Sequence, residues 1–165
     1  MLEAEYRTDE DKIGLTIELS RTNVDGKAGG PFGAAIFVAG GRYPIAIGIN
    51  RVLDGKSSLL HAETVALAEA HAVLETHDLS GHELFASCEP CAMCLGAVHA
   101  AGIDRLVFAA LREDAERVGF DEGPVFAQSY AYLEERGVEI VRGVQRSDAA
   151  AVIDLYAERG GAIYG

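Results

Sequence analysis

Three cysteines stand together in the segment Cys88-Glu-Pro-Cys91-Ala-Met-Cys94, and the chain has no others. An odd, clustered set of this kind does not form a secreted disulfide framework. In a reducing compartment it indicates metal binding or redox chemistry. Pro90 is favoured in the first turn of a helix, so the pattern predicts a short, nearly all-apolar helix over 90–101 that begins at the cysteines. Because a metal site needs further ligands, the fold is expected to bring other ligand-bearing side chains close to the start of that helix.

A second predicted helix start carries the sequence His61-Ala62-Glu63, and the stretch 61–77 has the Ala- and Glu-rich composition of a helix. Two residues turn a regular helix by about 200°, so His61 and Glu63 can both face one metal only at the N-cap and first turn. Cys91 and Cys94 lie three apart on one helix face, so both thiolates can bind the same ion. The positive end of the helix dipole favours thiolate over thiol there.

Counting ligands indicates which type of metal site these residues form. Structural zinc sites are normally closed by four protein ligands, whereas two cysteines and one histidine leave the fourth tetrahedral position open. An open position is typical of catalysis, because water bound there loses a proton near neutral pH and a nearby carboxylate can move protons. We therefore predict one Zn²⁺ per chain on His61, Cys91 and Cys94, with Glu63 as the catalytic proton carrier.

The remaining apolar patterns alternate between helix and strand along the 165 residues. A chain of this size, 49% apolar and without repeats or a long linker, can bury one core. We predict a single α/β domain over 1–165, with one sheet of about five strands covered by helices on both faces. The predicted helices are 8–23, 61–77, 90–101, 125–136 and 147–159. The predicted strands are 34–38, 43–50, 83–87, 105–110 and 138–144.

Charge and composition argue against several classes of function. The formal net charge is −12, with 14 basic and 26 acidic residues, so binding to a polyanion is disfavoured. The sequence contains neither a stretch of about 18 uncharged apolar residues nor a secretory signal pattern. We therefore expect a soluble cytoplasmic protein without nucleic-acid or membrane partners.

An H-x-E motif followed by P-C-x-x-C is the signature described for zinc-dependent base deaminases. Since His61-Ala62-Glu63 and Pro90–Cys94 match it in order, the chain resembles the cytidine/deoxycytidylate deaminase superfamily. Three further stretches look like bacterial guanine deaminases, namely Gly29-Gly-Pro-Phe-Gly33, Ser87–Ala97 and Asp114–Glu122. The resemblance covers nearly the whole chain. It implies a three-layer α-β-α sandwich with a single mixed five-stranded sheet, as in cytidine deaminases.

The resemblance also implies which residues contact the substrate. Asn50, which precedes the histidine motif, would hydrogen-bond the base, and Phe32 would line the pocket. Backbone groups around Ala62 and Glu89 would position the base and the departing amine. Glu122 falls where guanine deaminases carry an acidic residue that faces the substrate. We therefore expect these five residues to surround one small-molecule pocket.

The end of the chain, 145–165, is predicted to form a helix and a tail that caps a pocket. Tyr164 lies near the place where the family carries a C-terminal aromatic side chain that closes the pocket. In the family this tail often comes from a partner subunit. The resemblance therefore implies a homodimer, with swapped C-terminal tails as one possible arrangement.

Taken together, these features predict zinc-dependent hydrolytic deamination of a small nucleobase, with release of ammonia. The expected substrate is guanine or a related aminopurine or aminotriazine. Guanine deaminases tend to carry a tryptophan on the cysteine helix, whereas this chain has none and Ala100 occupies that region. A smaller side chain there predicts a more open pocket, so a cytosine- or cytidine-type substrate is an alternative.

Three alternatives from other classes stay open on the sequence alone. Cys88 and Cys91 also fit a thioredoxin-like redox motif, although that interpretation gives the histidine and glutamate no role. A non-catalytic zinc module would need only the metal ligands, and Glu63 distinguishes such a module from an enzyme. A tRNA adenosine deaminase would share the zinc motif but would need a basic surface, which the charge balance disfavours.

Overall fold

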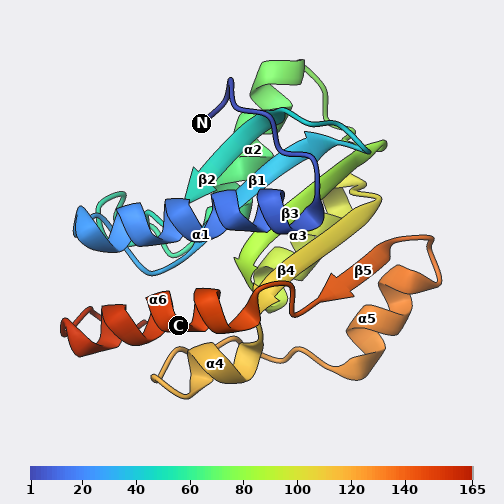
Figure 1. The fold of residues 1–165 in the computed structure, drawn as a ribbon. Coiled ribbons are helices and arrows are strands. Elements are labelled where there is room, and N and C mark those ends of the chain that lie inside the picture. The colour runs from blue at the N-terminus through green and yellow to red at the C-terminus, as the bar shows by residue number, and fades with distance from the viewer. Residues whose placement is uncertain (165) are drawn as a thin grey trace.

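Five strands form one mixed sheet in the order β2-β1-β3-β4-β5 in the computed structural model, which describes residues 1–164 (Figure 1). Strand β1 (Gly33–Val38) pairs antiparallel with β2 (Pro44–Ile49) and with β3 (His82–Cys88), which is the central strand. On the other side, β3, β4 (Arg105–Ala110) and β5 (Glu139–Arg142) run parallel. The predicted class, an α/β fold with a single mixed five-stranded sheet, is confirmed. Gly165, the last residue of the predicted tail, lies outside the described residues.

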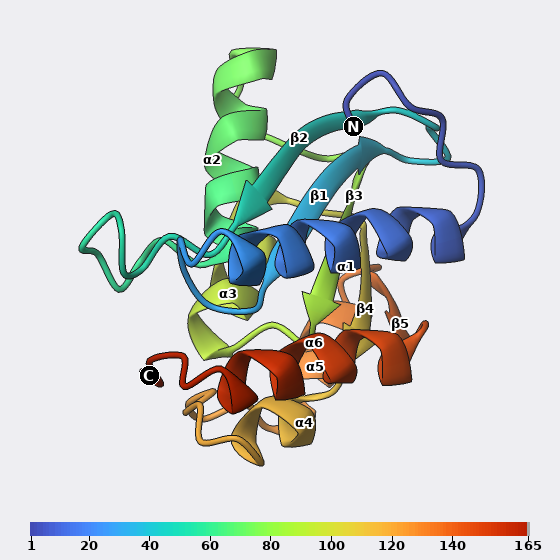
Figure 2. The ribbon, with the colours of Figure 1, turned by 60° about the vertical axis from the view of Figure 1, so that its left-hand side comes forward.

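Helices cover both faces of this sheet and so give the three layers expected. One core cluster joins α1, α4 and α6 to one face, and a second joins α2, α3 and α5 to the other (Figures 1 and 2). Within residues 1–164, none of the helices is long and apolar enough to cross a membrane. The helices are α1 (Asp9–Asp25), α2 (Ala62–Leu74), α3 (Ala92–Ala101), α4 (Arg112–Glu116), α5 (Ala127–Glu134) and α6 (Arg146–Glu158).

The middle strands are buried on both sides, which explains their almost continuous apolar sequences. Successive residues of β3 point to opposite faces, so Leu84 belongs to the core under α2 and α3, whereas Phe85 belongs to the core under α1 and α6. Likewise, Phe108 belongs to the core under α2 and α3, and Phe37 belongs to the core under α1 and α6. Each helical layer therefore has its own apolar core.

The helices that carry the site begin and end slightly differently from the prediction. The second helix ends at Leu74 because Glu75 adopts a left-handed conformation, with φ 52°. The cysteine helix begins at Ala92 rather than Pro90, since Cys91 is still extended, with φ −66° and ψ 173°. Both helices have an extended residue as N-cap, a geometry that the sequence required for His61 and Glu63 but did not predict for Cys91.

One short helix, α4, was not predicted. It is only five residues long, too short to show an apolar periodicity. Its first turn is stabilised by Asp114, whose carboxylate accepts a hydrogen bond of 2.8 Å from the backbone N–H of Leu111. This helix follows β4 directly and begins the connection to α5.

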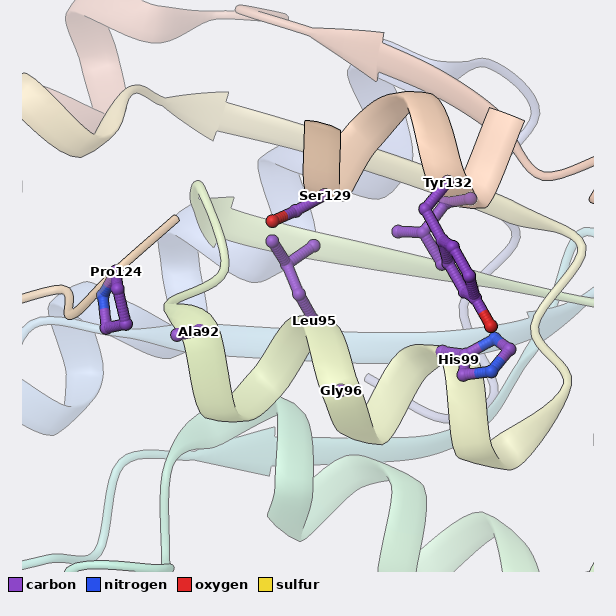
Figure 3. Close-up of a pocket in the computed structure, with 8 residues that line it drawn as sticks. Ala92, Leu95, Gly96, His99, Pro124, Ser129 and Tyr132 are labelled. Atoms are coloured by element: carbon purple, nitrogen blue, oxygen red, sulfur yellow. The ribbon is translucent and has the colours of Figure 1, made fainter. Parts of the chain in front are cut away.

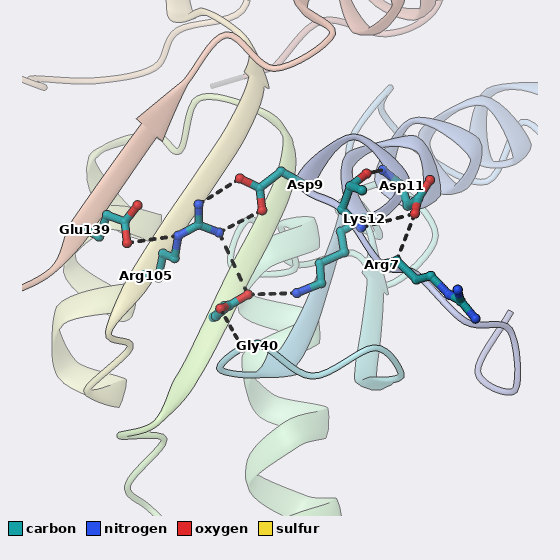
Figure 4. A network of polar contacts seen from close by, with 9 residues as sticks. Arg7, Asp9, Asp11, Lys12, Gly40, Arg105 and Glu139 are labelled. Carbon is teal, nitrogen blue, oxygen red and sulfur yellow. Dashed lines mark hydrogen bonds and ion pairs between the residues drawn. The ribbon is translucent and has the colours of Figure 1, made fainter.

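A cluster of ion pairs lies at the end of the sheet where β3, β4 and β5 begin (Figure 4). Lys12 of α1 and Glu83 of β3 form a buried pair with a distance of 3.0 Å. The Lys12 ammonium also lies 4.8 Å and 4.9 Å from the ring centroids of two core phenylalanines. Arg105 pairs with Asp9 at 2.7 Å and with Glu139 at 3.2 Å. These contacts connect α1 to three strands.

Candidate active site

Three ligand atoms meet between the starts of α2 and α3. The Nδ1 atom of His61 lies 3.5 Å from the Sγ atom of Cys91 and 3.6 Å from the Sγ atom of Cys94. All three ligand atoms lie within 4.8 Å of one another. A tetrahedral ion with Zn–S bonds of about 2.3 Å and Zn–N bonds of about 2.0 Å holds nitrogen and sulfur about 3.5 Å apart. The donor set therefore fits the zinc ion predicted from the sequence.

The contact between the two cysteines shifts their pKa values in opposite directions. The pKa of the Cys91 thiol is lowered to about 4, because the Cys94 thiol and His61 donate hydrogen bonds to its sulfur. The same contact, together with burial, raises the pKa of Cys94. Since the thiolate is the form that binds zinc, the pair already contains one ligand in its binding form.

Glu63 lies in the first turn of α2, next to the ligand that precedes the helix. The residue is 7% exposed and lines the same pocket as His61 and Cys91. Burial raises the pKa of its carboxyl above the ordinary value. A raised pKa brings a carboxyl closer to the range in which it both accepts and donates protons at neutral pH. The carboxyl is therefore suited to proton transfer beside the metal ligands.

The pocket next to these groups has a volume of about 30 Å³. That space holds about two water molecules, far less than the several hundred Å³ of a typical ligand site. Three residues that the sequence did not single out as substrate contacts also line it, namely Cys88, Phe120 and Asp121. The predicted residues on its wall are Phe32, Asn50, His61, Glu63, Glu89, Cys91, Glu122 and Tyr164.

Asn50 follows β2 and is 1% exposed. Its Oδ1 atom accepts hydrogen bonds from the backbone N–H groups of Gly30 (3.3 Å) and Val52 (3.2 Å) and from the hydroxyl of Tyr164 (2.6 Å). Its Nδ2 atom is buried and has no partner among the described residues. A buried donor without a partner is costly, so this amide is suited to donating to a ligand in the pocket.

One wall of the pocket is aromatic. Phe120 contacts Phe32 edge to face at a centroid distance of 5.0 Å and contacts Tyr164 in the same way at 5.5 Å. Phe120 is 4% exposed and belongs to the core under α6. A phenylalanine between Gly119 and an acidic pair could have been noted in the sequence, but nothing local distinguished it from a turn residue.

Glu122 comes to the pocket on the loop between α4 and α5. Its backbone carbonyl accepts a hydrogen bond of 3.1 Å from the N–H of Ala92, the first residue of α3. Burial, together with the charges of Cys91 and Glu63, raises the pKa of the Glu122 carboxyl to about 8. A second carboxyl thus faces the same small space as Glu63.

Two predicted residues are arranged differently from the others. Ala62 is fully buried in the first turn of α2 and does not line the pocket. Its carbonyl approaches β2 so closely that a Cβ atom on Gly48 would lie 2.1 Å from it. Glu89 does line the pocket, but both of its carboxylate oxygens accept hydrogen bonds, one from the backbone N–H of Arg112 and one from the Tyr130 hydroxyl.

Ala100 lies away from the pocket, which contradicts the expectation that its small side chain enlarges the site. It is exposed in a groove between α2 and α3, together with Thr64 and His71. The reason is the helical period, because Cys94 faces the metal site and Ala100 emerges on another side of α3.

A larger hollow of about 310 Å³ lies between α3 and α5 (Figure 3). Its wall includes Leu95, Gly96 and Pro124, together with His99, which contacts the Tyr132 ring edge to face at 5.2 Å. None of the three metal ligands lines it. His61, Cys91 and Glu63 line the smaller pocket instead.

The sequence profile of the cytidine and deoxycytidylate deaminase zinc-binding region matches residues 7–110 of this chain. The match includes His61, Glu63, Cys91 and Cys94. The chain therefore belongs to the cytidine and deoxycytidylate deaminase family of zinc-dependent enzymes, whose members are hydrolases acting on C–N bonds.

Among individual proteins, the chain is similar to guanine deaminases. It is 37% identical to the guanine deaminase of Bacillus subtilis over 129 residues, which is 78% of this chain and 81% of that one. A structure of the guanine deaminase from Nitrosomonas europaea is 41% identical, with a TM-score of 0.90, covering 94% of this chain and 87% of the other. A structure of NE0047 in complex with 2,6-diaminopurine is 42% identical, with a TM-score of 0.92, covering 98% and 88%.

Proposed function

We propose that this protein hydrolyses the exocyclic amine of guanine, or of a closely related aminopurine or aminotriazine, and releases ammonia. The observation that carries the proposal is the trio His61, Cys91 and Cys94 beside the buried carboxyl of Glu63. His61, Cys91 and Glu63 line one pocket with Asn50, whose amide N–H group has no partner among the described residues. The similarity to two guanine deaminases over most of the chain supports a purine as the substrate.

His61, Cys91 and Cys94 would hold one Zn²⁺ per chain. Zinc supplies the chemistry of a Lewis acid that makes water nucleophilic near neutral pH. Glu63 takes up the proton that the attacking water loses and delivers it to the ring nitrogen next to the amino-bearing carbon. Glu63 then assists proton transfer to the amine, so one water is consumed and one ammonia leaves. The buried position of Glu63 keeps these proton transfers away from bulk solvent.

Base recognition would come from the pocket wall opposite the ligands. The Asn50 amide nitrogen is available to donate to an oxygen or an unprotonated nitrogen of the ring. Phe32 and Phe120 offer flat apolar surface to a planar base. Glu122, with a raised pKa, can accept or donate at the other side of the pocket. Ala62 and Glu89 would act through backbone groups that position the base and the departing amine.

The C-terminal tail would open for substrate and close over it. A volume of about 30 Å³ is too small for a purine, and the Tyr164 hydroxyl occupies the side next to Asn50. The tail is held by the Tyr156 hydroxyl, which donates a hydrogen bond of 2.7 Å to the carbonyl of Ala162. We therefore propose that 145–165 caps the pocket of its own subunit, and that in a homodimer with swapped tails the same contacts would form between subunits.

Assembly and location complete the proposal. We expect a homodimer in the cytoplasm, where three free cysteines stay reduced. We also expect a role in purine metabolism and a small-molecule substrate rather than a nucleic acid. The similarity to a tRNA-specific adenosine deaminase of Buchnera aphidicola, 30% over 112 residues, extends to 68% of this chain, but the net charge of −12 disfavours a polyanionic substrate.

Ammonia release from a panel of bases tests the proposal. The panel contains guanine, guanosine, cytosine, cytidine, adenine and aminotriazines, and the proteins compared are the wild type, Glu63→Gln and, as a control, Glu69→Gln on the exposed side of α2. We expect turnover of guanine by the wild type and the control, and a loss of about 1,000-fold in Glu63→Gln at equal zinc content. Turnover of cytosine or cytidine instead would select the pyrimidine alternative. Near-normal turnover by Glu63→Gln would overturn the mechanism.

A further inference from the structure

The loop that carries Glu122 joins α4 to α5, and hydrogen bonds hold it on both sides of Glu122. Gly119 and Gly123 adopt left-handed conformations, with φ 110° and φ 69°, so the backbone turns sharply on either side of Glu122. One anchor is the hydrogen bond from the Ala92 N–H to the Glu122 carbonyl. It satisfies an N–H group at the start of α3 that has no partner within the helix.

The second anchor is Arg112, the first residue of α4. Its guanidinium donates a hydrogen bond of 2.6 Å to the carbonyl of Val125, just beyond the left-handed Gly123. It also pairs with Glu116 at 3.5 Å, within its own helix. A charge-assisted hydrogen bond of this length is among the stronger ones in proteins. Arg112 therefore holds the far end of the Glu122 loop.

Arg112 is itself held by Glu89, which lies two residues before the zinc ligand Cys91. One carboxylate oxygen of Glu89 accepts a hydrogen bond of 2.9 Å from the Arg112 backbone N–H. The other oxygen accepts from the hydroxyl of Tyr130 on α5. The Tyr130 ring in turn lies 4.6 Å from the guanidinium of Arg142. The Glu89 side chain thus joins the segment before α3 to α4 and α5.

We propose that Arg112 is a positioning residue for the reaction, which acts by holding the loop so that the Glu122 carboxyl faces the metal ligands. Tyr130 supports it through Glu89. Neither residue lines the pocket, so Arg112 acts through the Glu122 loop and Tyr130 acts through Glu89. This inference rests on the proposed function for its kinetic test, but its structural part can be tested without turnover.

The kinetic test is a double-mutant cycle between Arg112 and Glu122. Arg112→Ala should lower kcat/KM for guanine about 10-fold, with kcat and KM changed in the same proportion as in Glu122→Gln. In the Glu122→Gln background, the same Arg112→Ala change should cost less than about twofold, because the group that it positions is already gone. Arg112→Lys should restore part of the activity, since an ammonium can also donate to the Val125 carbonyl.

Matched controls separate positioning from general stability. Arg117→Ala is the first control. Arg117 directly follows α4, and it pairs at 2.8 Å with Asp154 of α6 rather than with the Glu122 loop. Tyr130→Phe should lower kcat/KM in the same way as Arg112→Ala but by a smaller factor. Its control is Tyr132→Phe, which removes a hydroxyl from α5 outside the site. Both controls should leave kcat/KM within about twofold. Equal losses from Arg112→Ala in the two backgrounds would overturn the proposal.

Hydrogen exchange tests the anchoring without any substrate. In Arg112→Ala, the Ala92 amide should exchange about 10-fold faster than in the wild type, because its acceptor is the carbonyl of Glu122. In Arg117→Ala the rate should stay unchanged. Unchanged exchange in Arg112→Ala would refute the anchoring even if the protein deaminates guanine. Faster exchange in a protein that deaminates no base would instead leave the anchoring intact and reject the proposed function.

Discussion

At the residue scale, the side-chain amide of Asn50 accepts hydrogen bonds from three separate parts of the chain. Its oxygen accepts from Gly30, Val52 and Tyr164, and its backbone carbonyl accepts a hydrogen bond of 2.9 Å from the buried Asn23 amide. Because the oxygen is fully engaged, the amide cannot rotate without losing three bonds. The nitrogen is therefore held toward the pocket as a donor.

The contact between Tyr164 and Asn50 leads to a prediction at Gly30. A Cβ atom at Gly30 would lie 2.2 Å from the Tyr164 hydroxyl, which sits at the end of a side chain and can move away. Gly30→Ala should therefore displace Tyr164 and lower kcat/KM for guanine about fivefold, the effect of losing one hydrogen bond. Tyr164→Phe should match it, and the double variant should lose no more than either single variant.

The measurement is steady-state ammonia release, with thermal unfolding recorded for each variant. Gly14→Ala is the control, since an added Cβ at that position in α1 meets no atom within 4 Å. It should keep the activity of the wild type. Additive losses in the double variant would mean that Gly30 and Tyr164 act on the site separately.

At the element scale, the sequence predicted long helices and central strands well because their signals are local. Thr8 and Asp11 form a capping box at the start of α1, close to the predicted boundary. The predicted strand 105–110 coincides with β4. The five-residue helix α4 was missed because it is too short to show an apolar period, and part of its stabilisation comes from a distant residue, Arg146.

The same distinction explains which parts of the site could be predicted. The candidate metal ligands and Glu63 could be predicted because they lie at two helix starts within short, recognisable motifs. Phe120 was missed because its role depends on packing against Phe32 and Tyr164, which are far away in the sequence. The position of Ala100 was misjudged because a family position was carried over without the orientation of the helix.

The contact between α4 and α6 gives a prediction about acid stability. Arg146 donates to both carboxylate oxygens of Asp114, at 2.8 Å and 3.0 Å. This contact, with the Leu111 N–H, holds the pKa of Asp114 below its ordinary value of 3.8 despite partial burial. A lowered pKa in the folded state stabilises the protein above about pH 4, and that stabilisation is lost as the pH falls through the folded pKa.

Asp114→Asn should therefore lower the melting temperature by about 2 °C at pH 7 and by progressively less below pH 4. Asp148→Asn, an exposed position on α6, should change the melting temperature by about 1 °C or less. Melting curves from pH 7 to pH 3 measure both. If the difference in melting temperature between the wild type and Asp114→Asn stays constant down to pH 3, the charge of the Asp114 carboxylate contributes nothing to stability.

At the scale of the whole molecule, the two ends of the sheet differ in character. The site lies where β3 and β4 end, next to Cys88 and Ala110. The buried pair of Lys12 and Glu83 lies where β3 begins, together with Arg105 at the start of β4 (Figure 4). One end thus holds reactive and unpartnered groups, and the other holds groups that are paired with one another.

Breaking the buried pair should destabilise the protein without changing its chemistry. Glu83→Gln leaves the Lys12 ammonium buried without its main counter-charge, so we expect the free energy of unfolding to fall by about 3 kcal/mol. Glu139→Gln, which removes an exposed partner of Arg105, should cost less than about 1 kcal/mol. Urea unfolding measures both values.

Activity per bound zinc should be the same in both variants and in the wild type at a temperature where all three are folded. A lower activity per zinc in Glu83→Gln would show that the two ends of the sheet are coupled. Equal losses of stability in the two variants would show that burial of the pair has no special importance.

This separation of the two ends affects how such a chain can change over evolutionary time. Substitutions in the loops that follow β2, β3 and β4 alter the pocket, whereas the paired groups at the opposite end preserve the folded state. Substitutions in these loops can therefore change substrate choice, while the paired groups at the opposite end of the sheet provide the stability that offsets destabilising mutations. Among related proteins with different substrates, sequence differences should then be concentrated at the end of the sheet where β3 and β4 end.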